Sequence, residues 1–243
     1  MCALPPTPIL SLTEGYCLDG RRFHPYSIRL EEQLRGAFPR GSRIFVDQQG
    51  RSGEPVVPNM RERLSRALVR AASDGGPFDW VCLLGGTNDA ICGADAAEVL
   101  EALDKMHAEI SSSGARLVAM TLPPFLAPLG DAERRAFYEI NSGLRQRFLP
   151  SAPLRGTVAG AGAALGAAGA DSGGEREEAA VSGVLQPPEG RLLVDLEALL
   201  SPAALGPAEA ARLWDDEVHL TPDGYGFVGD RIFEALLPHL GLR

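Results

Sequence analysis

Near the C-terminal end of the chain, a carboxylate and an imidazole are spaced for acid–base chemistry. The stretch Asp216-Glu217-Val218-His219 places an aspartate three residues before a histidine. At this spacing the carboxylate can fix the tautomer and the orientation of an imidazole that acts as a general base. A base of this kind removes a proton from a hydroxyl nucleophile, so the sequence predicts a serine or threonine partner for His219.

Two glycine-containing loops supply candidate hydrogen-bond donors for an oxyanion. Residues 85–89 read Gly-Gly-Thr-Asn-Asp, where the glycines allow close backbone approach and Asn88 offers a side-chain amide donor. Residues 48–54 read Gln-Gln-Gly-Arg-Ser-Gly-Glu, and Gly53 is the backbone N–H donor that we predict in this loop. Together these donors could stabilise negative charge that develops on a carbonyl oxygen.

The elements that must position these groups are short apolar runs that alternate with amphipathic stretches. Such alternation is typical of βαβ units around a parallel sheet. Loops at the carboxyl ends of such strands form a shared crevice, and both glycine loops directly follow a predicted strand. Five strands are predicted: Pro8 to Leu12, Arg43 to Asp47, Trp80 to Leu84, Arg116 to Leu122, and Arg191 to Asp195.

Helical periodicity predicts the intervening helices. Apolar residues recur at helical spacing in four stretches, one of which opens at Thr221-Pro222-Asp223, where Thr can cap, Pro suits the first turn and Asp meets the positive end of the helix dipole. The four predicted helices start near Asn59 and stop at Ser73, run from about Asp95 to Ser112, run from Ala132 to Phe148, and begin at Thr221.

The chain of 243 residues is expected to form one domain, residues 1–243. Within it, residues 156–183 are rich in glycine and alanine and end in a Glu-Arg-Glu-Glu run. This stretch has too few large apolar side chains to offset the entropy of ordering, so a flexible surface insertion is predicted.

In combination and order, these stretches resemble the SGNH, or GDSL-type, hydrolase and esterase family. That family has Gly-Asp-Ser after its first strand, then a glycine loop, then Gly-x-Asn-Asp, then Asp-x-x-His. The matching pieces are Ser11-Leu12-Thr13-Glu14-Gly15-Tyr16, residues 85–89, and Asp216 to Tyr225. The resemblance implies an α/β fold, a flavodoxin-like three-layer α/β/α sandwich around a central parallel five-stranded sheet.

The resemblance also implies a serine esterase that uses no cofactor and no metal. Ser11 corresponds to the nucleophile, His219 to the base held by Asp216, and Gly53 and Asn88 to oxyanion donors beside the Ser11 N–H. The implied substrates are carboxylic esters, with short-to-medium acyl chains as the default expectation. Thr13 is a poorer nucleophile candidate because its hydroxyl lacks the matching position.

The stretch around Ser11 departs from the family pattern. Ile9-Leu10 runs directly into Ser11, so four residues around the family's Gly-Asp are missing. An even deletion keeps the alternation of strand faces, but it removes about 13 Å of strand at roughly 3.3 Å per residue. The alternative hypothesis is therefore a catalytically impaired binding module that keeps the crevice without a working nucleophile.

Composition limits the other partners. The net charge of -9 and the lack of any Lys/Arg-rich run argue against nucleic acid or an anionic membrane surface as a partner. No signal peptide or membrane-spanning segment is evident, so a cytoplasmic protein acting on a small-molecule ester is expected. A third hypothesis, a nucleotide-binding flavodoxin-like domain, is disfavoured because the chain has neither G-x-G-x-x-G nor G-x-x-x-x-G-K-[ST].

Overall fold

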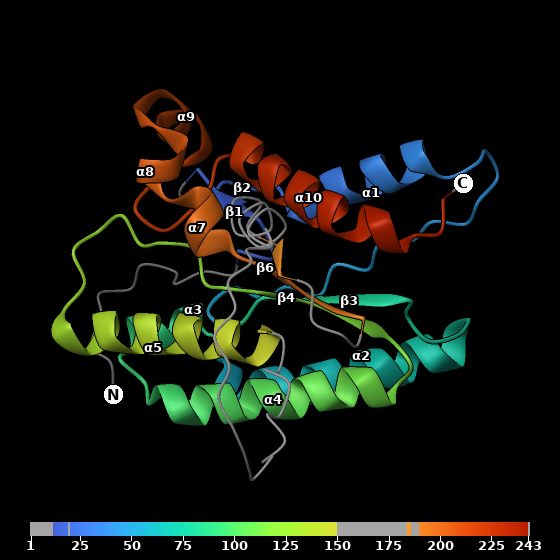
Figure 1. The fold of residues 1–243 in the computed structure, drawn as a ribbon, viewed down its shortest axis with the longest axis horizontal. Coiled ribbons are helices and arrows are strands. Elements are labelled where there is room, and N and C mark those ends of the chain that lie inside the picture. The colour runs from blue at the N-terminus through green and yellow to red at the C-terminus, as the bar shows by residue number, and fades with distance from the viewer. Residues whose placement is uncertain (1–11, 19, 150–183, 186–189, 243) are drawn as a thin grey trace, which may run out of the picture.

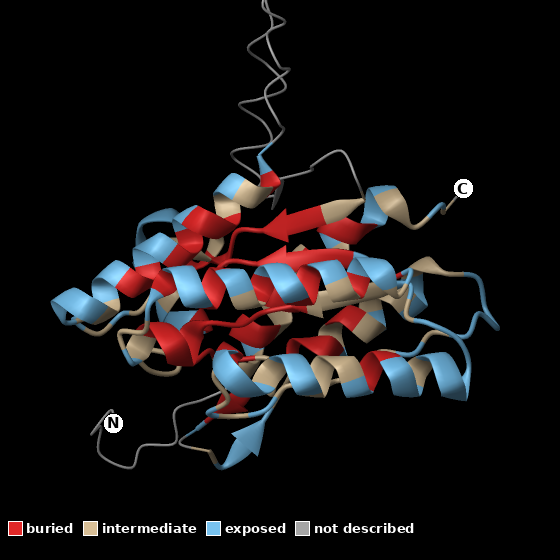
Figure 2. Cartoon of the chain, turned by 90° about the horizontal axis from the view of Figure 1, so that it is seen from below, coloured by how far each residue is buried: buried red, intermediate tan, exposed pale blue. Residues whose placement is uncertain are grey.

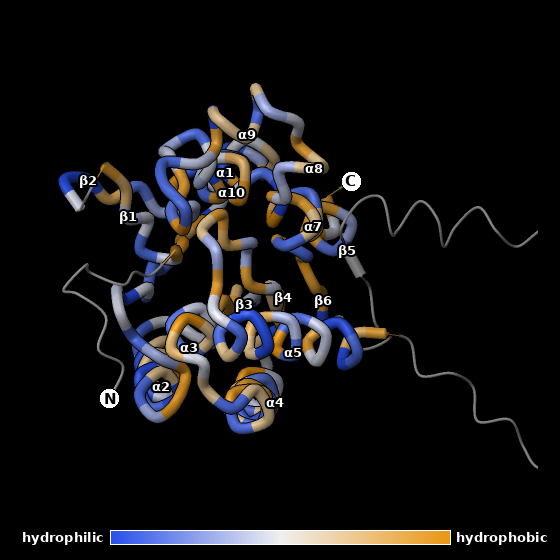
Figure 3. Tube along the Cα trace, turned by 90° about the vertical axis from the view of Figure 1, so that its left-hand side faces the viewer, coloured by the Kyte–Doolittle hydropathy of each residue, from blue (hydrophilic) through white to orange (hydrophobic). Residues whose placement is uncertain are grey.

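The protein folds as three layers with a sheet in the middle (Figure 1). The structure is a computed structural model that describes residues 12–18, 20–149, 184–185 and 190–242. Helices cover both faces of the sheet, as the view along its strands shows (Figure 3). The predicted α/β fold and its layered arrangement are therefore confirmed.

Three parallel strands form the centre of the sheet. They are β3 (Trp80–Leu83), β4 (Arg116–Met120) and β6 (Arg191–Val194), in the order β3-β4-β6. The register aligns Cys82 with Val118 and Val118 with Leu192, so the carboxyl ends of the strands meet at one edge. A two-residue strand, β5 (Val184–Leu185), pairs antiparallel with the outer side of β6. Three of the predicted strands are thus confirmed. Figure 2 shows most of β4 and β6 buried between the helices, whereas most of β3 is half-buried.

One helical layer consists of α1 (Tyr26–Ala37) packed along α10 (Pro222–Leu236), and the other contains α2 (Arg61–Asp74), α4 (Ala96–Ser112) and α5 (Asp131–Phe148). The shorter elements are β1 (Tyr16–Cys17), β2 (Arg22–Phe23), a π-helical turn η1 (Val56–Met60), α3 (Thr87–Ile91), α7 (Leu196–Leu200), α8 (Pro202–Leu205), α9 (Pro207–Leu213) and a 3₁₀ turn η2 (Leu237–His239).

The predicted helix starts have a local physical cause. The side chain of Asp95 accepts a hydrogen bond from the Ala97 N–H at the start of α4, and Thr221 accepts one from the Gly224 N–H at the start of α10. Each bond satisfies a backbone donor that has no partner inside its helix. The apolar residues of α4 and α5 that recur at helical spacing are buried against the sheet and each other, as predicted.

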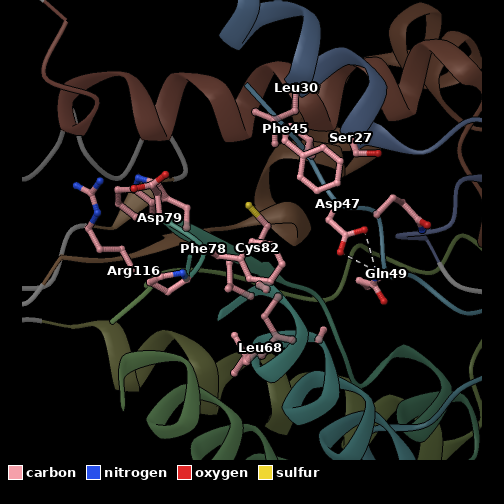
Figure 4. Close-up of a pocket in the computed structure, with 18 of the residues that line it drawn as sticks. Ser27, Leu30, Phe45, Asp47, Gln49, Leu68, Phe78, Asp79, Cys82 and Arg116 are labelled. Atoms are coloured by element: carbon pink, nitrogen blue, oxygen red, sulfur yellow. Dashed lines mark hydrogen bonds between the residues drawn. The ribbon is translucent and has the colours of Figure 1, made fainter. Parts of the chain in front are cut away.

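The predicted strand Arg43 to Asp47 is wrong, because this segment has no strand neighbour within the described residues. A groove of about 1000 Å³ separates it from the outer edge of β3 (Figure 4). The carbonyl of Ile44 instead accepts a hydrogen bond from the Arg35 side chain, and Phe45 is 79% exposed. A run of β-branched and aromatic residues favours a strand only where a second backbone is available to pair with it.

Several expectations concern residues outside the described ranges. The predicted strand Pro8 to Leu12 lies outside them except for Leu12, which is in a turn, and the predicted insertion 156–183 lies outside them entirely. Within the described residues, no helix is long and apolar enough to cross a membrane. Cys17 and Cys82 are free thiols.

A buried histidine makes the stability of the fold depend on pH. His107 lies on α4 against the ring of Phe148, and its Nδ1 is 3.5 Å from Nη2 of Arg191. Burial, reinforced by Arg191 and Arg147 and opposed by Asp104, lowers the pKa of His107 to about 4. Protonation therefore favours the unfolded chain, whose histidine has its ordinary pKa. This contribution to stability is complete above about pH 6.5 and is lost as the pH falls toward 4.

We expect the His107→Gln variant to lose less stability than the parent chain between pH 6.5 and pH 4. The difference should be on the order of 2 kcal/mol, because each pKa unit corresponds to about 1.4 kcal/mol. Urea unfolding at a series of pH values measures it, and subtracting the two curves cancels the contribution of the carboxylates. His24→Gln, at a half-buried position next to β2, is the matched control. Parallel curves for parent and His107→Gln would contradict the prediction.

Candidate active site

The Asp-x-x-His spacing corresponds to a tight turn closed by one carboxylate. Asp216 Oδ1 accepts hydrogen bonds from the backbone N–H groups of Val218 and His219, each at 2.7 Å. Its Oδ2 binds Nδ1 of the His219 ring. The turn is held at its base by the antiparallel bridge between Trp214 and Leu220. The structure thus joins Asp216 and His219 in the way that their spacing predicts.

The hydrogen bonds around Asp216 favour its ionised carboxylate. Partial burial raises the pKa of Asp216, but the hydrogen bonds from the His219 ring and the two backbone N–H groups outweigh burial and lower that pKa below its ordinary value. Because the carboxylate can only accept, Nδ1 donates in this hydrogen bond, and in the neutral imidazole Nε2 is then the acceptor nitrogen. His219 is buried, and its Nε2 has no hydrogen-bond partner among the described residues. Nε2 can therefore accept a proton, and the described residues place no donor next to it.

Asn88 lies in the first turn of α3, directly after the carboxyl end of β3. Gly86 adopts a φ of 109°, which favours glycine and lets the chain turn sharply from the strand into the helix. The buried Asn88 side chain donates from Nδ2 to the carbonyl of Glu54 at 3.0 Å, while its Oδ1 has no partner among the described residues. An amide carries two N–H groups, so a second proton remains for another acceptor.

The next residue, Asp89, secures the loop that follows Gly53. Its buried carboxylate accepts from the Val56 N–H at 2.8 Å and, more weakly, from the Val57 N–H at 3.4 Å. Burial raises the pKa of Asp89, and these two backbone hydrogen bonds oppose the increase. The two side chains of the Asn-Asp pair therefore both bind the 54–57 backbone.

Gly53 is exposed, with a φ of 76° that favours glycine, and lies beside the residue that Asn88 contacts. The neighbouring Glu54 carboxylate is nearly buried and forms an ion pair with Arg63 of α2. The same guanidinium donates to the carbonyl of Gln49, so Arg63 binds both ends of the loop. The structure consequently brings Gly53 and Asn88 together in one braced unit.

The segment Leu12–Leu18 contacts both halves of the site. Its Tyr16 ring packs on the His219 ring with centroids 5.0 Å apart, and its Leu18 N–H donates to Asp215 at 2.6 Å. On the other side, the carbonyl of Thr13 accepts from the Gln48 side chain at 3.1 Å. The segment that immediately follows position 11 thus lies between the Gly53 loop and the His219 turn.

Leu12 is buried where the sheet ends. It lines a small apolar cavity together with residues that follow each of the three parallel strands and with Leu220, the neighbour of His219. Ser11 lies outside the described residues, so the contacts of its hydroxyl are a prediction from the sequence. Of the five predicted residues, the structure joins Asp216 with His219 and brings Gly53 next to Asn88.

A family model for GDSL-like lipases and acylhydrolases matches residues 11–227, which is most of the chain. The chain belongs to the GDSL-like lipase/acylhydrolase family. The resemblance drawn from the sequence is thereby confirmed, and the match begins at Ser11. A comparison with curated proteins finds no match.

Two solved structures resemble this GDSL-like chain in fold. One is LAE5, an alpha/beta hydrolase enzyme from the metagenome of Lake Arreo, Spain, with 19% identity, a TM-score of 0.56, and coverage of 91% of this chain and 85% of that one. The other is the acetyl xylan esterase AlAXEase, with 16% identity, a TM-score of 0.52, and coverage of 87% of this chain and 90% of that one. At these identities the likeness supports the fold alone.

Several residues of the GDSL-like site are not among those predicted. Glu54 and Arg63 brace the Gly53 loop, Asp89 holds its far end, and Tyr16 packs on His219. Asp89 and Tyr16 lie inside the stretches that carry the family resemblance, so their position along the chain contained a signal. Arg63 had none, because an arginine on an amphipathic helix is ordinarily a solvent-exposed residue.

The Asp89 contacts make a measurable prediction for stability. Asp89→Ala leaves the buried Val56 N–H without an acceptor, which should lower the free energy of unfolding by about 1 to 3 kcal/mol. Asp89→Asn keeps one acceptor oxygen and should lose less than Asp89→Ala. Chemical denaturation of the two variants measures both effects, and Asp131→Ala, at the exposed start of α5, is the control. Equal stability of Asp89→Ala and the parent chain would disprove this assignment.

Proposed function

We propose that this GDSL-like chain is a serine esterase that hydrolyses carboxylic esters with short-to-medium acyl groups. Family membership supports acyl hydrolysis as the reaction class. The observation that carries the finer proposal is the buried His219, whose Nδ1 is bound by Asp216 while Nε2 is unpartnered among the described residues. A base oriented in this way is the central requirement of nucleophilic ester hydrolysis.

In the proposed mechanism, the Ser11 hydroxyl attacks the ester carbonyl while His219 Nε2 takes its proton. The Asp216 carboxylate stabilises the imidazolium that forms. The carbonyl oxygen becomes an oxyanion, for which the Gly53 N–H, the free Asn88 N–H and the Ser11 N–H are the proposed donors. The ester C–O bond then breaks, His219 gives the proton to the leaving alcohol, and Ser11 is left acylated. A water molecule, deprotonated by His219, attacks this acyl group, and the proton returns to the Ser11 oxygen as the acid is released.

The position of Leu12 supports Ser11 as the nucleophile. Consecutive Cα atoms are about 3.8 Å apart, so the buried Leu12 limits how far position 11 can lie from the crevice. The Tyr16 contact with His219 restricts the same segment from the other side. Thr13 accepts the Gln48 hydrogen bond through its carbonyl and precedes Glu14, which faces the Gly53 loop rather than His219.

A specific observation favours a second candidate, a catalytically impaired binding module. Residues 43–47 and the outer edge of β3 are not paired with each other or with any other strand of the described residues. Four residues of the family pattern are missing before Ser11, where the family's first strand ends. A displacement of the hydroxyl near 1 Å would be enough to reduce the rate about 100-fold.

Covalent labelling tests the esterase proposal directly. A fluorophosphonate probe should label the parent chain at Ser11, as located by peptide mass spectrometry, and should not label Ser11→Ala. His219→Ala should label and turn over at least about 1000-fold more slowly, because the hydroxyl loses its base. Asn88→Ala should lower kcat about 100- to 1000-fold. His24→Ala is the matched histidine control, and a Ser11→Ala protein that still became labelled would refute the assignment.

Restoring the missing residues separates the two candidates. We expect the parent chain to hydrolyse para-nitrophenyl acetate and butyrate, with turnover that disappears in His219→Ala. A version with Cys-Phe-Gly-Asp inserted before Ser11 should then gain less than about 10-fold in kcat/KM. If the parent is inactive and the insertion gains 100-fold or more, the impaired binding module is the correct description.

A further inference from the structure

One carboxylate connects the segment that follows Ser11 to the loop that carries Gly53. Glu14 Oε2 accepts a hydrogen bond from the Ser52 N–H at 2.7 Å and a second one from the Ser52 hydroxyl. Ser52 immediately precedes Gly53, so fixing the backbone of Ser52 also fixes the peptide that carries the Gly53 N–H. Hydrogen bonds to an ionised carboxylate are about twice as strong as those between neutral groups.

The two backbones that Glu14 joins are already in direct contact. A Cβ added at Gly50 would lie 2.5 Å from the Glu14 nitrogen and 2.7 Å from the Thr13 carbonyl carbon, so no side chain fits there. Gln48 donates across the same contact to the Thr13 carbonyl. The 48–52 loop and the 13–14 backbone thus move as one piece as long as these polar contacts remain.

The far end of the loop is secured independently. Arg63 binds the Glu54 carboxylate and the Gln49 carbonyl from α2, and Asn88 binds the Glu54 carbonyl from α3. These three contacts orient the loop relative to the sheet, but none of them involves the segment that follows Ser11. The Glu14–Ser52 contact and the neighbouring Gln48–Thr13 bond provide that connection.

We propose that Glu14 is a positioning residue that holds the Gly53 N–H in place relative to the segment that follows Ser11. This inference rests on the proposed function, because the Gly53 N–H and the Ser11 hydroxyl must reach the oxygen and the carbon of one ester carbonyl. An oxyanion donor is effective only when it lies about 2.7 to 3.1 Å from the oxygen position of the tetrahedral intermediate. A loosened Ser52 therefore weakens transition-state binding and leaves ground-state binding of the ester nearly unchanged.

Kinetics on para-nitrophenyl acetate distinguish this role from a general contribution to folding. Glu14→Ala should lower kcat about 10- to 100-fold with KM changed less than about 3-fold, the loss expected for a displacement of up to 1 Å. Glu14→Gln should recover most of kcat, because its amide oxygen still accepts from Ser52. Ser52→Ala keeps one of the two bonds and should lose less than Glu14→Ala. The double variant Glu14→Ala/Ser52→Ala should have the same kcat as Glu14→Ala, since both changes remove the same contact.

A readout that needs no turnover tests the contact itself. Arg51 is exposed in the middle of the loop, so trypsin cleavage after Arg51 reports how often the loop opens. Cleavage should be several-fold faster in Glu14→Ala than in the parent chain. Glu31→Ala is the matched control, because Glu31 also pairs with a single partner, Arg35, but on α1.

The outcomes separate the proposals. A parent chain without turnover would count against the esterase, while the trypsin assay would still test the contact between Glu14 and the loop. Unchanged cleavage in Glu14→Ala would overturn the proposed contact. Unchanged kcat in Glu14→Ala despite faster cleavage would overturn the positioning role. A loss of kcat that Glu14→Gln does not rescue, and that accompanies a lowered melting temperature, would overturn it as well.

Discussion

The backbone of residues 13–15 lies so close to two other backbones that side chains are excluded from both contacts. Gly50 approaches Thr13 and Glu14 on one side, and a Cβ on Gly15 would lie 2.2 Å from the backbone of His24 and Pro25 on the other. Gly15 also has a φ of 78°, a conformation that favours glycine. The rest of the site depends on this double contact, because it places the 12–18 segment between the Gly53 loop and the His219 turn.

From this contact, polar links extend in both directions along the crevice. Toward the His219 turn they run through the Tyr16 ring and through the Leu18 N–H to Asp215. The hydroxyl of Tyr225, on α10, adds a 2.7 Å bond to the Tyr16 carbonyl. Toward the oxyanion side they run through Thr13 and Glu14. The candidate groups come from distant parts of the chain, and the 12–18 segment holds them in one frame.

A second polar network lies at the carboxyl end of β6, and its carboxylate differs from Asp216 in its partners. Asp195 follows β6 at the same edge of the sheet as Asn88, and its carboxylate accepts from Thr121 and from Arg145. Burial raises the pKa of Asp195, but the hydrogen bonds and charge of Arg145 outweigh it and keep that pKa low. With its oxygens engaged by Thr121, Arg145 and the Ala198 N–H, Asp195 is a structural anion, whereas Asp216 faces an imidazole.

The sequence predicted those parts of the fold that local chemistry decides. The Thr-Pro-Asp start of α10 and the apolar periodicity of α4 predict helix boundaries to within a residue or two. The Asp-x-x-His spacing predicts the His219 turn for the same reason, since its hydrogen bonds close within four residues. The helix α1 was not predicted, although Tyr26, Leu30 and Leu34 recur at helical spacing. Its partner is α10, nearly two hundred residues later.

What the sequence could not predict depends on neighbours. Arg43 to Asp47 has the composition of a strand, but pairing requires a second backbone beside it, and the structure has a groove there. Likewise, nothing near Arg63 in the chain indicates that it binds Glu54 and Gln49, because that contact exists only when α2 packs beside the loop. The composition of a segment shows which secondary structures and contacts it can form. Its packing against other segments decides which of them it does form.

This distinction bears on the four residues missing before Ser11. Within the described residues, Asn88 binds the Glu54 carbonyl, Ser52 binds Glu14, and the Tyr16 ring packs on His219. These contacts hold the proposed base and the proposed oxyanion donors through side chains and tight backbone approaches. The missing residues therefore bear first on the proposed nucleophile, which precedes Leu12 directly. The two candidate functions differ in where the chain before Leu12 brings its hydroxyl, and they share the contacts that orient His219 and Asn88.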